Sequence, residues 1–254
     1  MSSLSPLADC LVTARKGKRQ AGYQPQLLPV DNAAAYAVQA EVAGALATVP
    51  AGWKVGLIPG GGGAFGAPIL ACDLMTSGAT YGLAPDMGGV KVEAELALRL
   101  ARDLPPRAGR PYTRQDILDA VGEVFVGIEL VVTRFNNVED APFAAKLADN
   151  FSNGAYVVGG GTKTFAAIDL SQIRCRLSVD GEIANDRLGG HGDGDPLVPV
   201  VAWASAQCDL LGGLKAGQFI TTGTLNVPVA LNRAAKLEAS LERIGAVSLA
   251  VIER

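Results

Sequence analysis

Apolar side chains recur at helical spacing in two stretches near the start of the chain. Residues 3–16 predict one helix, and residues 31–48 predict a second. Asp31 or Asn32 can cap the second helix, because a short polar side chain there accepts hydrogen bonds from the free backbone N–H groups of the first turn. The pattern therefore predicts a helical region in the first part of the chain.

Two stretches farther along also have the pattern of helices. Residues 113–122 (TRQDILDAVG) begin at Thr113, which can cap a helix, and end at Gly122, which can close one. Residues 198–212 (VPVVAWASAQCDLLG) are apolar over most of their length and predict another helix.

The remaining apolar stretches are short and rich in β-branched residues, which favours strands. Residues 92–104 (VEAELALRLARDL) are ambiguous, because alternation favours a strand at their start while their Ala, Leu and Arg content suits a helix. Asp180-Gly181 is typical of a hairpin turn. The predicted strands are 52–58, 123–135, 154–161, 175–183, 217–225 and 245–252.

The order of these elements indicates the fold class. Helices come first, then strands interrupted by occasional helices, and regular strand–helix alternation is missing. This order predicts an α+β protein with a mixed β-sheet roll. We expect an N-terminal helical region over residues 1–50 and a single β-roll catalytic unit over residues 51–254.

A glycine-rich stretch matches the spacing of a dinucleotide-binding motif. Residues 61–66 read GGGAFG, and Asp86 lies 20 residues beyond Gly66. That motif needs a helix directly after the glycines, but Pro68 and the later sequence TSGATYG leave little room for one. We therefore predict a flexible loop over residues 59–67 instead of a nucleotide site.

Composition excludes several classes of function. The net charge of −3 indicates no nucleic-acid interface, and no apolar run approaches the roughly 20 residues of a membrane span. The four cysteines lack CxxC spacing, which fits a reducing compartment, and the start of the chain lacks the pattern of a secretion signal. We therefore expect a cytoplasmic protein that binds neither nucleic acid nor membrane.

Histidine is almost absent, since His191 is the only one in 254 residues. Metal sites built on two histidines are excluded, and any Ser–His–Asp triad would depend on this single residue. The chemistry must therefore rest on carboxylates, lysines and hydroxyls.

Three acidic residues occur in stretches that otherwise resemble buried strands. Glu93 and Glu95 alternate with apolar residues in KVEAELA, so on a strand both face the same side. Glu129 stands alone in the apolar stretch FVGIELVV. Buried like charges repel unless a partner offsets them, and a divalent cation such as Mg²⁺ or Mn²⁺ prefers such oxygen ligands. The pattern thus favours a metal site if these two strands pair.

An ordinary structural alternative remains open at this point. Glu93 and Glu95 could be exposed on a helix, with Glu95 and Arg99 forming an i,i+4 ion pair. Glu129 would then pair with an arginine such as Arg134.

A family resemblance follows from six motifs in a fixed order along nearly the whole chain. The chain resembles the 2-keto-4-pentenoate hydratases (2-hydroxypentadienoate hydratases) of the fumarylacetoacetate hydrolase superfamily, and the related 4-oxalocrotonate decarboxylases share most of the motifs. The motifs are KVGL, KVEAELALRLARDLP, IELVVTRF, LADNFSNGAYVVGG, LSVDGE and LKAGQFITTGTL. The resemblance implies the fumarylacetoacetate hydrolase C-terminal-like roll with peripheral helices, and a homo-oligomer.

The resemblance also implies roles for particular residues. The family's E-x-E and its later glutamate bind Mg²⁺ or Mn²⁺, which assigns Glu93, Glu95 and Glu129 as metal ligands. It assigns Lys54 and Asp73 as catalytic residues. Ser152, Thr222 and Gly223 match positions that bind substrate in the family.

Ordinary structural roles are open for several of these residues. Lys54 could be a solvated strand residue, and Asp73 could cap or form a turn. Ser152, which stands between other polar residues, could equally cap a turn.

The implied chemistry explains why these residue types occur together. A small-molecule 2-oxo acid can chelate one cation through its carboxylate and keto oxygens, and the cation acts as a Lewis acid toward the enolate-like form. Lys54 would hold the substrate carboxylate or move protons, with its pKa lowered by the metal. Asp73 would move the proton that tautomerises the dienol before water adds.

The chain departs from the family pattern at three points. Members usually carry Thr-Ser after KVGL and then a longer stretch, whereas this chain has Ile58-Pro59 followed by Gly60–Gly63. Members usually show GHPL late in the chain, whereas this chain has GDPL with Asp195, and His191 lies four residues upstream. The His–Glu pair of the hydrolase branch has no evident counterpart, which disfavours C–C bond hydrolysis.

Three hypotheses for function follow. The first is a metal-dependent hydratase that adds water to a 2-hydroxy-2,4-dienoate, giving a 4-hydroxy-2-oxo acid in aromatic catabolism. The second is decarboxylation of 2-oxo-3-hexenedioate (4-oxalocrotonate) by the same metal and enolate chemistry. The third is a non-catalytic paralogue that acts as an assembly partner, although a scaffold has no need for three clustered glutamates.

Overall fold

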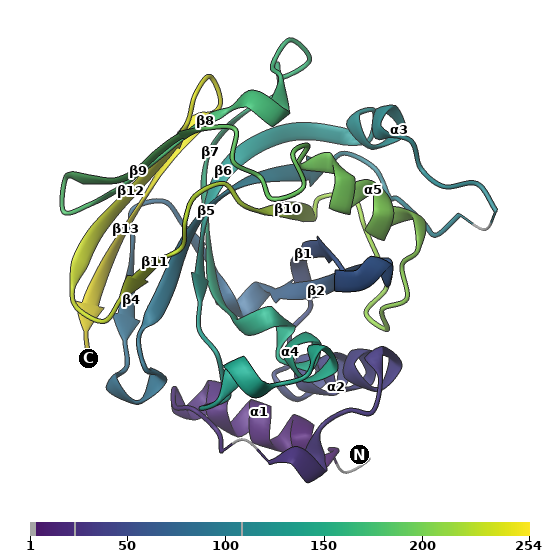
Figure 1. The fold of residues 1–254 in the computed structure, drawn as a ribbon, viewed down its shortest axis with the longest axis vertical. Helices are drawn as coiled ribbons and strands as arrows, with labels where there is room; N and C mark the ends of the chain where they lie inside the picture. The colour runs from purple at the N-terminus through teal and green to yellow at the C-terminus, as the bar shows by residue number, and fades with distance from the viewer. Residues whose placement is uncertain (1–3, 23, 108) are drawn as a thin grey trace.

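The computed structural model describes residues 4–22, 24–107 and 109–254, and the chain folds into curled β-sheets with peripheral helices (Figure 1). The described helices are α1 (Pro6–Gly17), α2 (Asn32–Ala45), α3 (Arg114–Leu118), α4 (Phe143–Ala148) and α5 (Leu197–Ser205). The described strands are β1 (Pro50–Leu57), β2 (Ala64–Leu70), β3 (Leu74–Thr76), β4 (Ala79–Leu83), β5 (Val90–Leu100), β6 (Val121–Val131), β7 (Asn153–Thr162), β8 (Arg174–Val179), β9 (Glu182–Leu188), β10 (Phe219–Thr224), β11 (Val229–Leu231), β12 (Ala235–Leu241) and β13 (Gly245–Glu253).

These strands form two sheets in the described part of the chain. The larger sheet has the order β2-β1-β10-β5-β6-β7-β3, with β11 paired to β5. The smaller sheet has the order β4-β13-β12-β8-β9. Parallel pairs such as β1–β10 and β4–β13 occur among antiparallel ones, so both sheets are mixed. The predicted α+β fold with a mixed β roll is confirmed.

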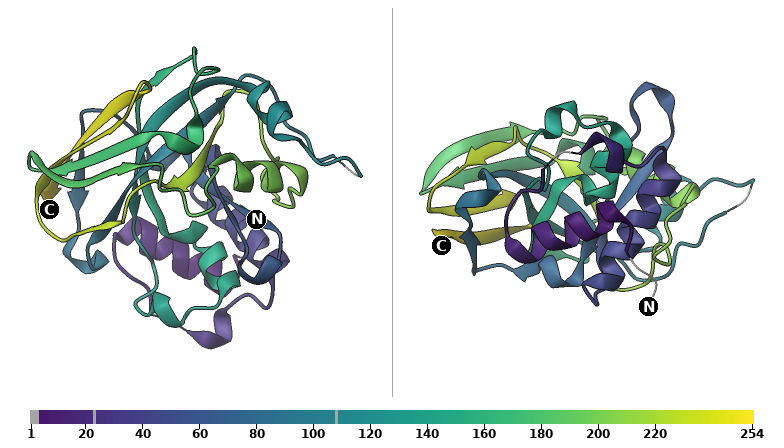
Figure 2. Two further views of the ribbon diagram at one scale, coloured as in Figure 1. Left: turned by 45° about the horizontal axis from the view of Figure 1, so that its top comes forward. Right: turned by 90° about the horizontal axis from the view of Figure 1, so that it is seen from below.

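The N-terminal helices gather at one end of the curled large sheet. Figure 1 places α1, α2 and α4 together, and the view from below in Figure 2 shows α1 and α2 in front of the strands. The Gln39 amide on α2 donates to the backbone oxygen of Leu147 on α4 at 2.6 Å. Tyr36 on α2 stacks on Trp203 of α5, with ring centroids 5.9 Å apart. These contacts join the helices to one continuous core.

The predicted helices near the start of the chain are confirmed, with ends shifted by a few residues. The helix expected over residues 3–16 is α1, and the one expected over 31–48 is α2. Asp31 caps α2, because its side chain accepts a hydrogen bond from the Ala34 N–H at 2.8 Å.

The helix predicted over residues 113–122 is correct at its start and wrong at its end. Thr113 caps α3 in a capping box with Asp116, as the sequence indicates. Gly122 does not close the helix, because it already lies in strand β6. Val121 pairs with Leu100 in the sheet, and this pairing outweighs the marginal stability of so short a helix.

The helix predicted over residues 198–212 ends at Ser205. The Gln207 side chain turns back and donates to the Ala204 carbonyl at 2.9 Å, which satisfies a backbone oxygen of the last turn. Asp209 then accepts hydrogen bonds from the N–H groups of Leu211 and Gly213, which forms a turn in place of more helix.

The glycine-rich stretch is partly strand, so the loop predicted over residues 59–67 is too long. Pro59–Gly61 form a short turn, and β2 starts at Ala64, opposite Leu57 of β1. A Cβ atom on Gly66 would overlap the indole ring of Trp203, so this glycine serves close packing of a strand. The segment after the glycines is a strand, whereas a dinucleotide motif requires a helix there.

The ambiguous residues 92–104 form strand β5 over most of their length, because this segment pairs on both sides within the large sheet. The hairpin at Asp180-Gly181 is confirmed, with φ angles of 54° and 85° at its two turn residues. Strands β3, β4, β11 and β12 carry no prediction from the sequence patterns. No helix in the described residues is long and apolar enough to cross a lipid bilayer.

The contact between the two sheets depends on a close approach at Gly159. A Cβ atom there would lie 2.5 Å from Val247 Cβ and 2.7 Å from the Val126 carbonyl oxygen, whereas at Gly160 the nearest atom would be 3.4 Å away. We predict that Gly159→Ala lowers the free energy of unfolding by about 1–3 kcal/mol. Gly160→Ala is the matched control and should change that free energy by less than about 0.5 kcal/mol. Urea denaturation measures both, and equal effects would contradict this description of the sheet contact.

Candidate metal centre

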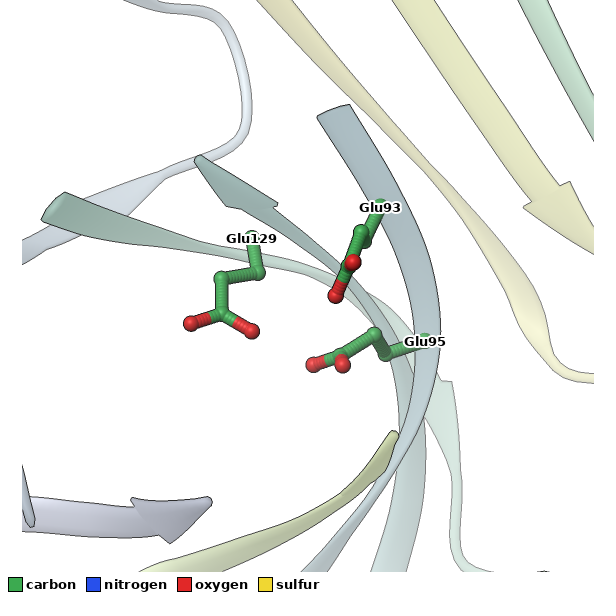
Figure 3. A group of neighbouring side chains, drawn as sticks. All are labelled: Glu93, Glu95 and Glu129. Atoms are coloured by element: carbon green, nitrogen blue, oxygen red, sulfur yellow. The ribbon is translucent and has the colours of Figure 1, made fainter. Parts of the chain in front are cut away.

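The three glutamates project from neighbouring strands toward one point. Glu93 and Glu95 lie two residues apart on β5, so their side chains leave the same face of the sheet. Glu129 on β6 stands directly opposite Glu93 in the antiparallel register. One carboxylate oxygen from each residue lies within 4.8 Å of the other two (Figure 3). The structure therefore brings the three predicted ligands together.

The ordinary alternatives for these residues are wrong. Glu93 and Glu95 lie on a strand and not on an exposed helix, and the Glu95 side chain is buried. Glu129 is fully buried as well and does not pair with Arg134. Arg134 instead forms an ion pair with Asp149 at 2.6 Å.

Hydroxyl and amide groups orient the two buried glutamates. The Thr221 hydroxyl on β10 donates to Glu95 Oε2, and the Tyr156 hydroxyl donates to Thr221 Oγ1 at 3.2 Å. The Asn153 amide on β7 donates to Glu129 Oε1 at 2.9 Å. Each carboxylate thus has one oxygen held by a hydrogen bond from a neighbouring strand.

Lys54 lies beside this group, as the family resemblance implies. The parallel pairing of β1 with β10 places Lys54 next to Thr221. Its ammonium nitrogen is 2.8 Å from Glu129 Oε2 and 3.5 Å from the backbone oxygen of Phe151. The Lys54 side chain is 14% exposed, so it lies largely buried beside the carboxylates.

The electrostatics of the cluster are unfavourable to ionised carboxylates. Burial, and then the charges of Glu129 and Glu93, raise the pKa of Glu95 well above its ordinary value. Burial also raises the pKa of Glu93, where Lys54 opposes the shift. Burial alone would lower the pKa of Lys54, but the three carboxylates outweigh it and raise that pKa above the ordinary lysine value. The lowered lysine pKa that the sequence analysis expected requires a bound cation, because the carboxylates act in the opposite direction.

The residues present fit a divalent cation. Glu95 Oε1 is buried and has no hydrogen-bond partner in the described residues, and an unpaired buried oxygen is unfavourable. When all groups are ionised, three glutamates and one lysine carry a formal charge of −2, which one divalent cation neutralises. Carboxylate oxygens are the ligands that Mg²⁺ and Mn²⁺ prefer. Glu93, Glu95 and Glu129 are thus suited to hold such an ion.

Asp73 is not part of this group. It ends a short turn after β2, and its carboxylate forms an ion pair with Arg15 of α1 at 2.9 Å. Both residues line a cavity of about 320 Å³ whose wall includes neither Lys54 nor any of the three glutamates. The structure does not bring Asp73 to the carboxylates, and its catalytic role stays a prediction.

The residues predicted to bind substrate lie on elements that border the cluster. Ser152 precedes Asn153 and has a left-handed backbone with φ 61°. The Thr222 hydroxyl donates to the Leu96 backbone oxygen at 3.1 Å, so it is already engaged. Gly223 has φ 105° and lies where the pairing of β10 with β5 is irregular. Their contact with a substrate stays a prediction.

His191 and Asp195 hold structural contacts in this chain. The Thr222 backbone oxygen is 2.7 Å from His191 Nε2, and His191 Nδ1 accepts a hydrogen bond from the Asp193 N–H at 3.1 Å. Nε2 therefore carries the ring hydrogen and donates a hydrogen bond to the Thr222 backbone oxygen. Asp195 forms an ion pair with Arg114 at 2.6 Å.

Sequence reasoning missed Thr221 and Asn153, which orient the glutamates. Thr221 lies in the family motif ITTGTL and Asn153 in ADNFSN, but the family resemblance assigns substrate binding to their neighbours Thr222 and Ser152. Strand alternation is the signal that separates Thr221 from Thr222, because adjacent residues face opposite sides. Using it requires the register of β10 against β5, which the sequence alone does not provide.

Comparisons with known proteins show the family of this chain. The family described as fumarylacetoacetate (FAA) hydrolase C-terminal matches residues 73–252. The chain is 34% identical over 158 residues to a 2-keto-4-pentenoate hydratase of Burkholderia vietnamiensis; the match covers 62% of this chain and 58% of that relative. It is 27% identical over 178 residues to a 4-oxalocrotonate decarboxylase of Pseudomonas putida, covering 67% of this chain and 66% of that protein.

A solved structure extends the likeness of fold to the whole chain. The 4-oxalocrotonate decarboxylase from Pseudomonas putida G7, complexed with magnesium and adipate, superposes with a TM-score of 0.84 at 21% identity. The superposition covers 98% of this chain and 97% of the other. At this identity the likeness concerns the fold alone. The match of the family model over residues 73–252 confirms the family resemblance inferred from the six motifs.

The first prediction for this site concerns metal affinity. Glu95→Gln keeps the size of the side chain but removes a ligand charge, so Mn²⁺ binding should weaken by more than about tenfold. Glu123→Gln is the matched control, since Glu123 also lies on the β5–β6 pair but is bonded to Arg99 at 3.1 Å. Titration of Mn²⁺ followed by electron paramagnetic resonance measures both variants. Unchanged affinity in Glu95→Gln would refute the ligand assignment.

The second prediction for this site concerns pH. The pKa values of Glu93 and Glu95 are raised above the ordinary 4.5, so the folded state binds more protons than the unfolded state above that pH. The metal-free protein should therefore lose stability as the pH rises from about 5 to about 8. Added Mn²⁺ should suppress the loss by neutralising the cluster. Melting temperatures in chelator measure the trend, and a melting temperature that rises over this range, or a slope unchanged in Glu95→Gln, would contradict it.

Proposed function

This chain belongs to the fumarylacetoacetate hydrolase C-terminal family, and we propose that it is a metal-dependent hydratase of 2-hydroxy-2,4-dienoates. The reaction adds water to a small 2-oxo acid of the 2-keto-4-pentenoate type and gives a 4-hydroxy-2-oxo acid, as in aromatic catabolism. The observation that carries the proposal is the convergence of Glu93, Glu95 and Glu129 beside Lys54. Sequence similarity to relatives named as such hydratases supports the substrate class.

The three glutamates would hold Mg²⁺ or Mn²⁺. When bound, the ion supplies Lewis-acid stabilisation of the negative charge that develops on a 2-oxo acid as it enolises. Hydrogen bonds from neighbouring strands orient two of the carboxylates: Thr221 donates to Glu95, and Asn153 donates to Glu129. These hydrogen bonds keep both ligands directed at the same point, so little reorganisation is needed when substrate enters.

Lys54 is the residue we assign to proton transfer. Ketonisation of 2-hydroxypenta-2,4-dienoate moves a proton from the 2-hydroxyl group to carbon 5, and water then adds at carbon 4 while carbon 3 gains a proton. Lys54 Nζ is the charged donor closest to the carboxylates, at 2.8 Å from Glu129, and its side chain is partly open to solvent. The same ammonium group can pair with the substrate carboxylate.

Decarboxylation of 2-oxo-3-hexenedioate is the second candidate. Loss of CO₂ from that substrate also generates an enolate, so the same residues would serve it. The similarity to a 4-oxalocrotonate decarboxylase extends over 67% of this chain, slightly more than the 62% covered by the hydratase relative. The higher identity to hydratases, 34% against 27%, favours the first candidate.

The matched part of the chain spans only 58% of the length of the 2-keto-4-pentenoate hydratase relative, so the activity of the whole protein belongs to this proposal. We also propose that the protein is cytoplasmic and forms a homo-oligomer. The four cysteines Cys10, Cys72, Cys175 and Cys208 are free thiols, which suits a reducing compartment.

Turnover of 2-hydroxypenta-2,4-dienoate tests the proposal. With Mg²⁺ or Mn²⁺ present, the ultraviolet absorbance of the dienol should fall and 4-hydroxy-2-oxopentanoate should form. Lys54→Met should lower kcat by about 10²–10⁴, the usual contribution of a proton-transfer group. Lys215→Met is the control, because Lys215 is exposed and bonded only to Asp103 among the described carboxylates.

The outcomes separate the three hypotheses. Loss of dienol with intact Mn²⁺ binding supports the hydratase. CO₂ release from 2-oxo-3-hexenedioate without hydration would replace it with the decarboxylase. No turnover of either substrate by a folded, metal-loaded protein would contradict both and favour a non-catalytic assembly partner.

A further inference from the structure

The cavity that Arg15 and Asp73 line lies between α1 and the β roll, and four cationic side chains contribute to its wall. Its volume is about 320 Å³, within the range of small-molecule sites. Arg15, Lys18, Arg134 and Arg254 contribute positive charges to its wall, and Asp73 contributes one negative charge. These residues come from distant parts of the sequence, so the charge pattern arises only from the fold.

The inner wall contains two arginines that differ in how well they are paired. Arg134 is 2% exposed and donates to Asp149 and to the backbone oxygens of Val132 and Asn153. Arg15 is 8% exposed, and its ion pair is with Asp73, at 2.9 Å. Arg134 is thus committed to holding the loop around Asp149, whereas Arg15 presents a buried guanidinium group to the cavity with a single ionic partner in the described residues.

Lys18 and Arg254 form the mouth of the same cavity. Both residues are exposed, and neither forms an ion pair within the parts of the chain that the structure describes. The Arg254 side chain lies against Gly82 of β4. A Cβ atom on Gly82 would overlap the Cγ, Cδ and Nε atoms of Arg254. Gly82 therefore permits this arginine to lie along the cavity wall.

The cations repel one another, and Asp73 and Asp149 offset only part of that repulsion. Burial, and then the charge of Arg134, lower the pKa of Arg15 to about 10. Burial and the charge of Arg254 lower the pKa of Lys18. Four cations against Asp73 and Asp149 leave a formal charge of +2 around the cavity. The whole chain has a net charge of −3, so the positive charge around this cavity is a local feature.

We propose that this cavity binds a small organic dianion, of the dicarboxylate or phosphate-ester class, through Arg15, Lys18 and Arg254. The two charges of such a ligand would offset the excess positive charge. Met75, Tyr81 and Met87 line the same space and provide contact for a short carbon chain. Asp73 can accept a hydrogen bond from a hydroxyl group on the ligand. The site is separate from the three glutamates, so it does not rest on the proposed hydration reaction.

Isothermal titration calorimetry of the full chain in Mg²⁺ tests this proposal with succinate and with inorganic phosphate at matched ionic strength. We expect one binding site, and affinity should fall by about tenfold or more in Lys18→Ala/Arg254→Ala, because two charges that face the ligand are lost. Lys16→Ala is the matched control, since Lys16 lies in the last turn of α1, two residues before Lys18, but outside the cavity wall. Binding should weaken with added salt.

Each outcome bears on the proposal. Binding of succinate or of phosphate that is lost in the double variant upholds it and identifies the source of the dianion. Equal binding by the double variant and Lys16→Ala overturns it. Binding that is lost in Glu93→Ala but kept in the double variant also overturns it, because the anion would then occupy the metal centre. Acetate that binds as tightly as succinate would contradict a site for a dianion.

Discussion

Mutual repulsion of three clustered carboxylates, two of them fully buried and one half-buried, is the constraint around which this structure is arranged. The antiparallel pairing of β5 with β6 sets Glu93 directly opposite Glu129, and strand alternation adds Glu95 to the same face. Placing like charges together in a buried site is unfavourable, and one lysine and two neutral donors offset only part of the cost. The three glutamates and Lys54 together keep a formal charge of −2, and one buried carboxylate oxygen has no hydrogen-bond partner among the described residues. A divalent cation would neutralise this charge and bind this oxygen.

The surrounding fold keeps that arrangement rigid. β1 and β10 bring Lys54 and Thr221 side by side, and β7 supplies Asn153 from the other edge of β6. The helices are not part of the cluster, but α1, α2 and α4 lie together at one end of the curled sheet, and α1 carries Arg15 to the cationic cavity. The molecule thus separates two opposite charges: an acidic centre suited to a cation, and a basic cavity suited to an anion.

The sequence predicted those parts of the structure that depend on local pattern. Alternation identified Glu93 and Glu95 as neighbours on one face, and the isolated Glu129 was recognisable because a charge in an apolar strand needs a partner. The motifs KVGL and IELVVTRF identified the family and placed Lys54 beside the glutamates. Helix starts at Asp31 and Thr113 were also predictable, because caps are local features.

The parts that local pattern did not predict depend on contacts between distant segments. Gly66 lies in a strand because it pairs with Val55 of β1, and the indole of Trp203 leaves no space there for a larger side chain. The ion pair of Asp73 with Arg15, 58 residues earlier, joins segments that no local pattern connects, and the catalytic role of Asp73 stays a prediction. The sequence did not identify Thr221 as the residue that contacts Glu95, because that contact depends on how β10 is aligned with β5.

The position of a bound Mn²⁺ ion in a crystal of the protein tests the central claim most directly. We expect one anomalous peak in contact with an oxygen of each of Glu93, Glu95 and Glu129, at about 2.0–2.3 Å. A peak elsewhere, or none at this place while Lys54 remains bonded to Glu129, would contradict the claim that these carboxylates form a metal centre.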